Sequence, residues 1–122
     1  MAQAIALHHA ADVIEPSSAG ICPLGYIVES TQQTLCANGY SPDGLSSKPF
    51  RRGALNTTDL IINLAGLPRD RVFDNLPNVE DWDVEDPYGE DSATYQRILE
   101  EIESRVLSLA TRLRAAQPAA HP

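Results

Sequence analysis

The residues best suited to acid–base chemistry gather in one short stretch, DWDVEDPYGED at residues 81–91. Asp and Glu fill most of residues 80–91, and Asp86 lies directly before Pro87 and Tyr88. A proline ring restricts the backbone, so the carboxyl beside it is held at a defined position, and one of these acids could have a chemical role. The alternative interpretation is a solvated acidic turn without a chemical role.

The sequence contains two cysteines, Cys22 and Cys36. Their spacing fits neither a Cys-x-x-Cys redox pair nor a zinc knuckle. We expect two free, partly buried thiols, because the chain has no export signal that would favour a disulfide.

The sequence predicts no metal site and no cofactor. His8 and His9 are adjacent, and neighbours on a helix point about 100° apart, which makes a poor chelate. The acidic stretch offers oxygen ligands to calcium or magnesium, but its glycine, Gly89, falls too late for an EF-hand loop.

Length and charge limit the class of protein. The chain has 122 residues, which predicts one domain over residues 1–114 followed by a frayed tail at 115–122. Its net charge of -8 argues against nucleic acid as a partner, because binding to phosphates requires basic side chains. No apolar run is long enough to span a membrane, and the N-terminus lacks the basic start of a signal peptide. We therefore expect a cytoplasmic protein.

Helices and strands alternate along the chain, which predicts an α/β fold with a mostly parallel sheet. The most secure element is a helix from 92 to about 114, capped by Asp91 or Ser92, with a continuous apolar stripe. Its stripe comprises Tyr95, Ile98, Leu99, Ile102, Val106, Leu109 and Leu113. The other predicted elements are helices at 2–11 and 25–38, the second ended by Gly39, and strands at 13–17, 59–66 and 82–84.

Four segments in this order resemble one known family. They are SSAG at 17–20, GYSPDGLSSKPF at 39–50, TTDLIINL at 57–64 and VEDPYGED at 84–91. Together they resemble the low-molecular-weight protein tyrosine phosphatases and the arsenate reductases that share their fold. The resemblance implies a three-layer α/β fold. It also implies that Asp86 is the general acid, that Tyr88 lines the mouth of the site, and that Ser18 borders the phosphate-binding loop.

The chain departs from the family pattern at the phosphate-binding loop. The family carries Cys-x5-Arg-Ser followed by Pro-Met-Ala, whereas this chain begins Met1-Ala2 and contains no such loop. The resemblance therefore implies a fold without its first, interior strand and a catalytically incomplete protein, a pseudophosphatase in which Asp86 is vestigial and the activity is binding or scaffolding. Whether the chain is an enzyme stays open. The alternatives are an active phosphatase or arsenate reductase-like enzyme whose start site is assigned too late, and changed chemistry that uses the acidic loop.

Two further expectations follow from the resemblance. Arsenate reductases that use a thiol relay carry cysteines after the buried strand, and residues 63–75 contain none, which favours the phosphatase branch. A missing interior strand exposes the edges of both neighbouring strands, one of them near residues 59–64. Exposed apolar edges pair with other chains, so we expect a homodimer; the alternative is that the two neighbouring strands close up on each other within one monomer.

Overall fold

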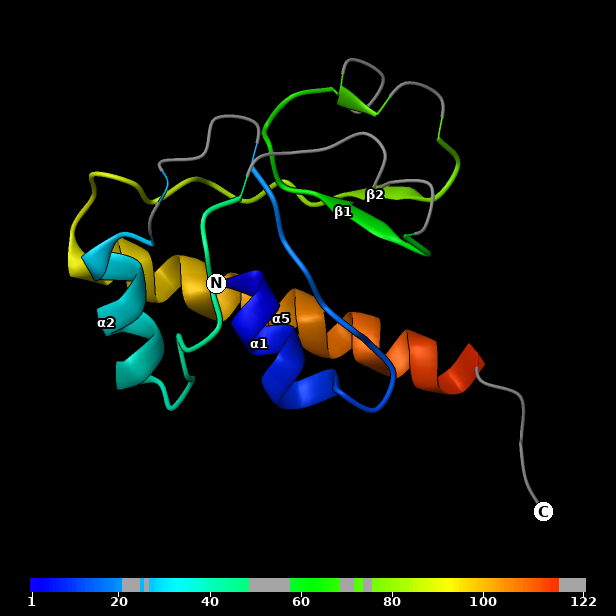
Figure 1. Cartoon of the computed structure of the whole chain (residues 1–122), viewed down its shortest axis with the longest axis horizontal. Coiled ribbons are helices and arrows are strands. Elements are labelled where there is room, and N and C mark those ends of the chain that lie inside the picture. Colours follow the sequence, from blue (N-terminus) through cyan, green and yellow to red (C-terminus); the bar gives the residue numbers. More distant parts are fainter. Residues whose placement is uncertain (21–24, 26, 49–57, 69–71, 74–75, 117–122) are drawn as a thin grey trace.

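The computed structural model of the chain describes residues 1–20, 25, 27–48, 58–68, 72–73 and 76–116. The elements in these residues, in chain order, are α1 (Ala2–Ala10), α2 (Glu29–Ala37), β1 (Ile61–Asn63), β2 (Val79–Asp81) and α5 (Ser92–Ala116) (Figure 1). No helix among the described residues is long and apolar enough to cross a membrane.

The two strands form a small parallel sheet. Ile61 is paired with Val79, Ile62 with Glu80, and Asn63 with Asp81. Parallel strands require a crossover between them, and residues 64–78 provide it. The predicted α/β class and parallel pairing are therefore confirmed for the part of the chain that the structure describes.

β1 is shorter than the predicted strand at 59–66 because the Asn63 side chain closes a turn directly after it. Its Oδ1 accepts a hydrogen bond from the Ala65 N–H at 3.0 Å. Its Nδ2 donates to the Leu67 carbonyl at 3.0 Å and to Asp81 Oδ1 at 2.9 Å. Asn63 is only 5% exposed, so these bonds satisfy a buried amide and also fix the end of the strand.

Two strand predictions are wrong in position or kind. The strand expected at 82–84 lies at Val79–Asp81, because the register with β1 places Val79 opposite Ile61. The strand expected at 13–17 does not form. Val13 and Ile14 instead donate backbone hydrogen bonds to the Ala10 carbonyl, at 3.0 and 2.8 Å, and close a turn after α1.

The helix predictions are closer to the structure. α1 matches the predicted helix at 2–11, and α2 begins at Glu29 rather than 25, because Val28 has an extended backbone. Gly39 ends α2 as predicted, with φ of 83°. The Tyr40 N–H bonds the Leu35 carbonyl at 2.9 Å, and the Gly39 N–H bonds the Cys36 carbonyl at 3.1 Å, which is the Schellman motif.

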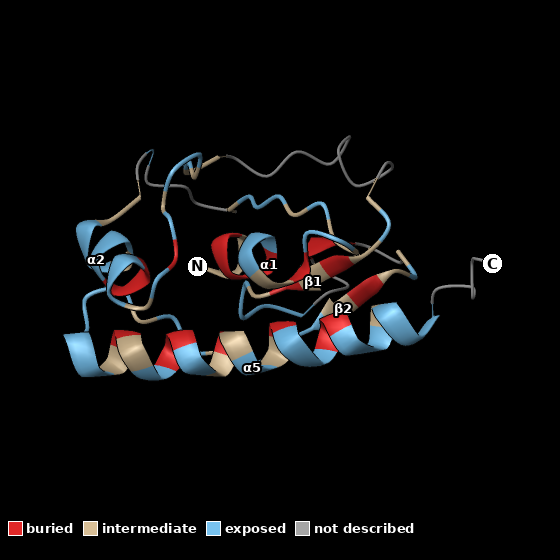
Figure 2. Ribbon diagram, turned by 90° about the horizontal axis from the view of Figure 1, so that it is seen from below, coloured by how far each residue is buried: buried red, intermediate tan, exposed pale blue. Residues whose placement is uncertain are grey.

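α5 confirms the predicted apolar stripe and extends to Ala116, past the predicted end at 114. Six of the seven stripe residues are buried, and Leu113 is half-buried. The buried face of α5 is turned toward α1, α2 and the sheet, and its exposed face toward solvent (Figure 2). Residues 117–122 lie outside the described part of the chain, and the domain boundary at 114 stays a prediction.

The apolar core has two parts, one on each face of the sheet. The larger part fills the space between the helices and one sheet face; Ile5, Leu35 and Leu99 at its centre are 0% exposed. The smaller part lies on the opposite face and consists of Ile61, Val72, Phe73 and Val79, with Leu76 beside them. The two faces follow the alternation of side chains along β1, since Ile61 faces one part and Ile62 the other.

Candidate functional site

Asp86 and Tyr88 lie in an exposed turn directly before α5. Asp86 Oδ1 accepts a hydrogen bond from the Tyr88 N–H at 3.0 Å, and the Pro87 carbonyl accepts one from the Glu90 N–H at 2.9 Å. Gly89 has φ of 82°, a conformation that other residues adopt only with strain. The turn is therefore fixed by its own sequence, and the prediction that Asp86 precedes the last helix without joining it is confirmed.

Two side chains attach this turn to α5. Glu85 accepts a hydrogen bond from Arg97 at 3.1 Å, although both side chains are more than half exposed. Asp91 Oδ1 accepts one from the Thr94 N–H at 2.9 Å, so Asp91 is the predicted helix cap. The Thr94 backbone N–H lowers the pKa of Asp91, because it stabilises the charged carboxylate.

Glu80, the first acid of the cluster, also has a structural role. It accepts a hydrogen bond from the Trp82 indole N–H at 2.7 Å and two from Arg112, both at 2.9 Å. The Trp82 hydrogen bond, with the Arg112 contact, lowers the pKa of Glu80. Glu80, Glu85 and Asp91 thus hold the ends of the acidic stretch in place, and Asp86 lies between them.

Ser18 lies at the other end of the sequence, at the head of α1. Its hydroxyl donates a hydrogen bond to Gln3 Oε1 at 2.6 Å, and the Gly20 N–H donates to the Lys48 carbonyl at 2.8 Å. The loop at 17–20 is therefore held between the first turn of α1 and the backbone of Lys48. Among the described residues, no hydrogen bond or ion pair joins Ser18 to Asp86.

Among the described residues, no thiol lies in surroundings that would make it a nucleophile. Cys36 lies in α2, free and exposed, so the expectation that it is partly buried is wrong. Its exposure follows from its place on the outer face of α2, next to the buried Leu35. Cys22 lies outside the described residues. In the part of the chain that is described, no group of three or more His, Cys, Asp or Glu side chains could hold a metal ion.

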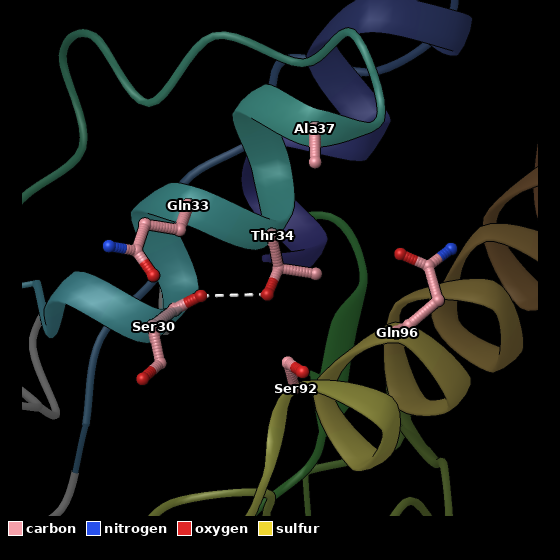
Figure 3. A pocket seen from close by; sticks show the side chains of 6 residues that line it. All are labelled: Ser30, Gln33, Thr34, Ala37, Ser92 and Gln96. Atoms are coloured by element: carbon pink, nitrogen blue, oxygen red, sulfur yellow. Dashed lines mark hydrogen bonds between the residues drawn. The ribbon is translucent and has the colours of Figure 1, made fainter.

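A polar pocket of about 230 Å³ lies between α2 and the head of α5 (Figure 3). No pattern in the sequence indicates this pocket. The pocket is lined by Ser30, Gln33, Thr34, Ala37, Ser92 and Gln96. None of these side chains is charged, and the Thr34 hydroxyl is already bonded to the Ser30 carbonyl at 2.7 Å. The lining therefore provides no cation for a phosphate group.

Tyr40 is the centre of a network that sequence reasoning missed. Its hydroxyl is hydrogen-bonded to His9 Nε2 at 2.7 Å and donates a second hydrogen bond to Glu103. The ring also meets that of His8 edge-on, with centroids 5.1 Å apart. Burial, together with the Glu103 carboxylate, raises the pKa of Tyr40. The network joins α1, the end of α2 and α5, and the only sequence signal for it is the position of Tyr40 directly after Gly39.

The parallel sheet, the helices packed on it and the exposed Asp-Pro turn before the last helix define a small α/β protein. Residues 1–119 match the family described as low molecular weight phosphotyrosine protein phosphatase. The chain belongs to this family.

Solved structures agree with this assignment at the level of the fold. A protein tyrosine phosphatase is 18% identical, with a TM-score of 0.84 over 96% of this chain and 88% of that chain. The tyrosine phosphatase Wzb from Escherichia coli K30, in complex with sulphate, is 16% identical. Its TM-score is 0.80, and the match covers 92% of this chain and 87% of that chain. An arsenate reductase in the phosphate binding state is 21% identical. Its TM-score is 0.77, and the match covers 92% of this chain and 86% of that chain. No curated protein sequence matches the chain closely enough to count as a relative.

Proposed function

We propose that the 122 residues form a catalytically incomplete member of the phosphatase family, whose activity is binding rather than turnover. The observation that supports this proposal is an acid without a nucleophile. Asp86 stands in a fixed, exposed turn, yet neither cysteine of the sequence is followed six residues later by arginine. Cys36 lies in the last turn of α2, the end at which a helix presents carbonyl groups rather than the N–H groups that bind a phosphate.

The ligand class that this proposal implies is a phosphorylated tyrosine in a peptide. Tyr88 is 59% exposed, and its ring offers a flat apolar face to an aromatic side chain. Ser18, whose hydroxyl donates to Gln3 Oε1, lies at the head of α1, where backbone N–H groups favour an anion. Asp86 contributes a carboxylate that a bound phosphate would repel, which limits the affinity of an incomplete site.

Hydrolysis of p-nitrophenyl phosphate tests the absence of turnover. The chain is expected to hydrolyse it no faster than Asp86→Asn does, because the nucleophile and its phosphate donors are needed for family-like rates. A burst of nitrophenol that the Asp86→Asn change abolishes would contradict the proposal.

Binding is tested separately, by titrating the chain with a phosphotyrosine peptide and with the same peptide unphosphorylated. Only the phosphorylated peptide is expected to shift the amide signals of Tyr88 and Ser18 in NMR spectra. Tyr88→Ala is expected to weaken binding by about fivefold, since one aromatic contact contributes about 1 kcal/mol. Leu107→Ala, an exposed apolar change on α5, serves as the control and is expected to leave binding unchanged.

We infer a second candidate from the environment of Met1, namely an active enzyme in which residues upstream of Met1 supply the catalytic loop. The Met1 side chain packs against the helical core, and burial lowers the pKa of its amine. A charged amine is costly to bury, and a peptide bond at this position would remove that cost. An upstream reading frame that encodes Cys-x5-Arg-Ser, together with a larger mass of the native protein, would support this candidate. The extended chain should then show burst kinetics that depend on Asp86.

A further inference from the structure

The pocket between α2 and the head of α5 is formed by one face of each helix (Figure 3). Residues three and four positions apart lie on the same face of a helix. This spacing joins the four lining residues of α2, which are Ser30, Gln33, Thr34 and Ala37. It also joins the two lining residues of α5, which are Ser92 and Gln96. Because α2 packs against α5, the lining side chains keep a defined arrangement.

Gln96 is held in place by Asn38. Gln96 Nε2 donates a hydrogen bond to Asn38 Oδ1 at 2.9 Å, and Asn38 Nδ2 donates to Gln96 Oε1 at 2.7 Å. Asn38 Nδ2 also donates to the Thr34 carbonyl at 2.8 Å, which fixes the asparagine in turn. An amide nitrogen carries two N–H groups, and an amide oxygen has two lone pairs. After its bonds with Asn38, the Gln96 amide therefore retains one donor and one acceptor in a fixed orientation.

The opposite wall of the pocket is less polar than its sequence suggests. The Thr34 hydroxyl donates to the Ser30 carbonyl at 2.7 Å, and this bond leaves the Thr34 methyl group pointing toward α5 (Figure 3). Ala37 adds a second methyl group on the same face of α2. The pocket thus has methyl groups on the side of α2 and, on the side of α5, an amide and the Ser92 hydroxyl.

This lining fits an uncharged amide on a short apolar stem. A carboxylate or phosphate would find no lining cation and an ammonium group no lining carboxylate, and a charge that loses water without a partner is costly. A primary amide, in contrast, can donate to and accept from the Gln96 amide, while its methylene groups lie on the methyl groups of α2. The volume of about 230 Å³ equals that of seven to eight water molecules at ~30 Å³ each, which is enough for one such side chain.

The pocket lies within reach of a ligand bound at Tyr88. Ser92 follows Tyr88 by four residues, so their Cα atoms are at most about 14 Å apart. An extended peptide advances about 3.3 Å per residue. A peptide whose tyrosine contacts Tyr88 can therefore place a residue within about four positions of that tyrosine in the pocket.

We propose that this pocket binds the side chain of a glutamine or asparagine that lies within about four residues of the phosphotyrosine in a bound peptide. Gln96 donates to the carbonyl oxygen of this side chain and accepts from its amide nitrogen. The inference rests on the proposed phosphotyrosine ligand and adds the neighbouring residue that the peptide must carry.

Peptide titrations of the unaltered chain test the proposal directly. The reference is a phosphotyrosine peptide with alanine at the four positions on each side, and each alanine is replaced by glutamine in turn. At one or two positions glutamine is expected to tighten binding about fivefold, the effect of one net hydrogen bond. Leucine and glutamate at the same positions, similar in size, should give no such gain. Equal affinities for glutamine and leucine at every position would overturn the proposal.

Two variants locate the gain in the pocket. Gln96→Leu removes the donor and the acceptor and is expected to abolish the preference for glutamine over leucine, while the affinity for the alanine peptide stays the same. Ser92→Ala should reduce the preference, whereas Ser108→Ala, the same change at an exposed position farther along α5, should not. A preference for glutamine that persists in Gln96→Leu would contradict the proposed site.

A probe without phosphate separates this inference from the proposed function and needs no variant. N-acetylglutamine amide, added at millimolar concentration, is expected to shift the NMR signals of Thr34, Ala37 and Gln96. Such shifts, without binding of any phosphopeptide, would support the pocket and overturn only the phosphotyrosine ligand. Binding of the alanine phosphopeptide, with neither these shifts nor a gain from glutamine, would overturn the pocket and leave the proposed function intact.

Discussion

The helical layer and the turn at residues 84–91 differ in how their side chains are held. In the helical layer the contacts join residues far apart in the sequence, as Tyr40 joins His9 and Glu103. In the turn, the hydrogen bonds of Asp86 and Pro87 connect residues two or three positions apart. The helical layer therefore depends on the whole fold, whereas the shape of the turn depends on its own few residues.

The ends of the helices show the same dependence on distant residues. Arg114, in the last turn of α5, donates to both carboxylate oxygens of Asp12, at 2.9 and 2.8 Å, and to the His9 carbonyl at 2.8 Å. One guanidinium thus binds the C-terminal end of α1, where carbonyl groups lack partners within the helix. Substitutions in the helical layer should therefore change stability, whereas side-chain substitutions in the turn that keep its backbone conformation should not.

The largest effect is expected from Leu99→Ala. Leu99 is 0% exposed at the centre of the helical core, so its truncation should leave a cavity and lower the free energy of unfolding by about 2–5 kcal/mol. Urea unfolding measures this loss. Leu107→Ala, at a position that is 43% exposed on the same helix, is the matched control and should change stability by less than about 0.5 kcal/mol. Equal losses of unfolding free energy at Leu99 and Leu107 would contradict the view that the buried core carries the stability of the helical layer.

A smaller effect is expected from Tyr40→Phe. The change keeps the buried ring but removes the hydroxyl that His9 and Glu103 share, and it should lower the free energy of unfolding by about 1–2 kcal/mol. Tyr88→Phe removes the same group from an exposed ring and should have no measurable effect on stability. Thermal unfolding of the Tyr40→Phe and Tyr88→Phe variants tests both expectations. An unchanged unfolding midpoint for Tyr40→Phe would show that the hydrogen bonds of the Tyr40 hydroxyl do not contribute to stability.

A modest pH dependence is expected from Glu80. Its folded-state pKa lies below the ordinary value, so the folded protein binds fewer protons there than the unfolded chain. Its contribution is present above the unfolded pKa of about 4.3 and is lost as the pH falls through the folded value. Glu80→Gln should therefore flatten the loss of stability in acid, whereas Glu100→Gln, an exposed change on α5, should not. Urea unfolding between about pH 6 and pH 3 would reveal the difference; parallel curves for wild type and Glu80→Gln would contradict it.

The smallest effect on stability is expected from Asp86→Asn. The asparagine side-chain oxygen can still accept the hydrogen bond from the Tyr88 N–H, so the midpoint of thermal unfolding should stay the same. Gly89→Ala is the informative contrast in the same turn, because φ of 82° strains alanine and should lower stability by about 1 kcal/mol. A large loss for Asp86→Asn would show that the turn is held by more than its local bonds.

The features that depend on neighbouring residues could be predicted from the sequence. The apolar stripe of α5, its cap at Asp91 and the end of α2 at Gly39 follow from helix periodicity and capping, which act over a few positions. The turn after Asp86 is of the same kind, since Pro87 and Gly89 define it locally. The collinear motifs that carry the family resemblance also lie in the sequence alone.

The features that depend on a partner elsewhere in the chain could not be predicted from the sequence and became visible in the folded structure. A strand forms where another strand is available to pair with it, so β2 lies at Val79–Asp81 opposite β1, and residues 13–17 form no strand. Tyr40 meets His9 across 31 positions and Glu103 across 63, distances over which local patterns carry no information. The physical reason is the same in each case: hydrogen bonds between distant segments form only after packing has brought those segments together.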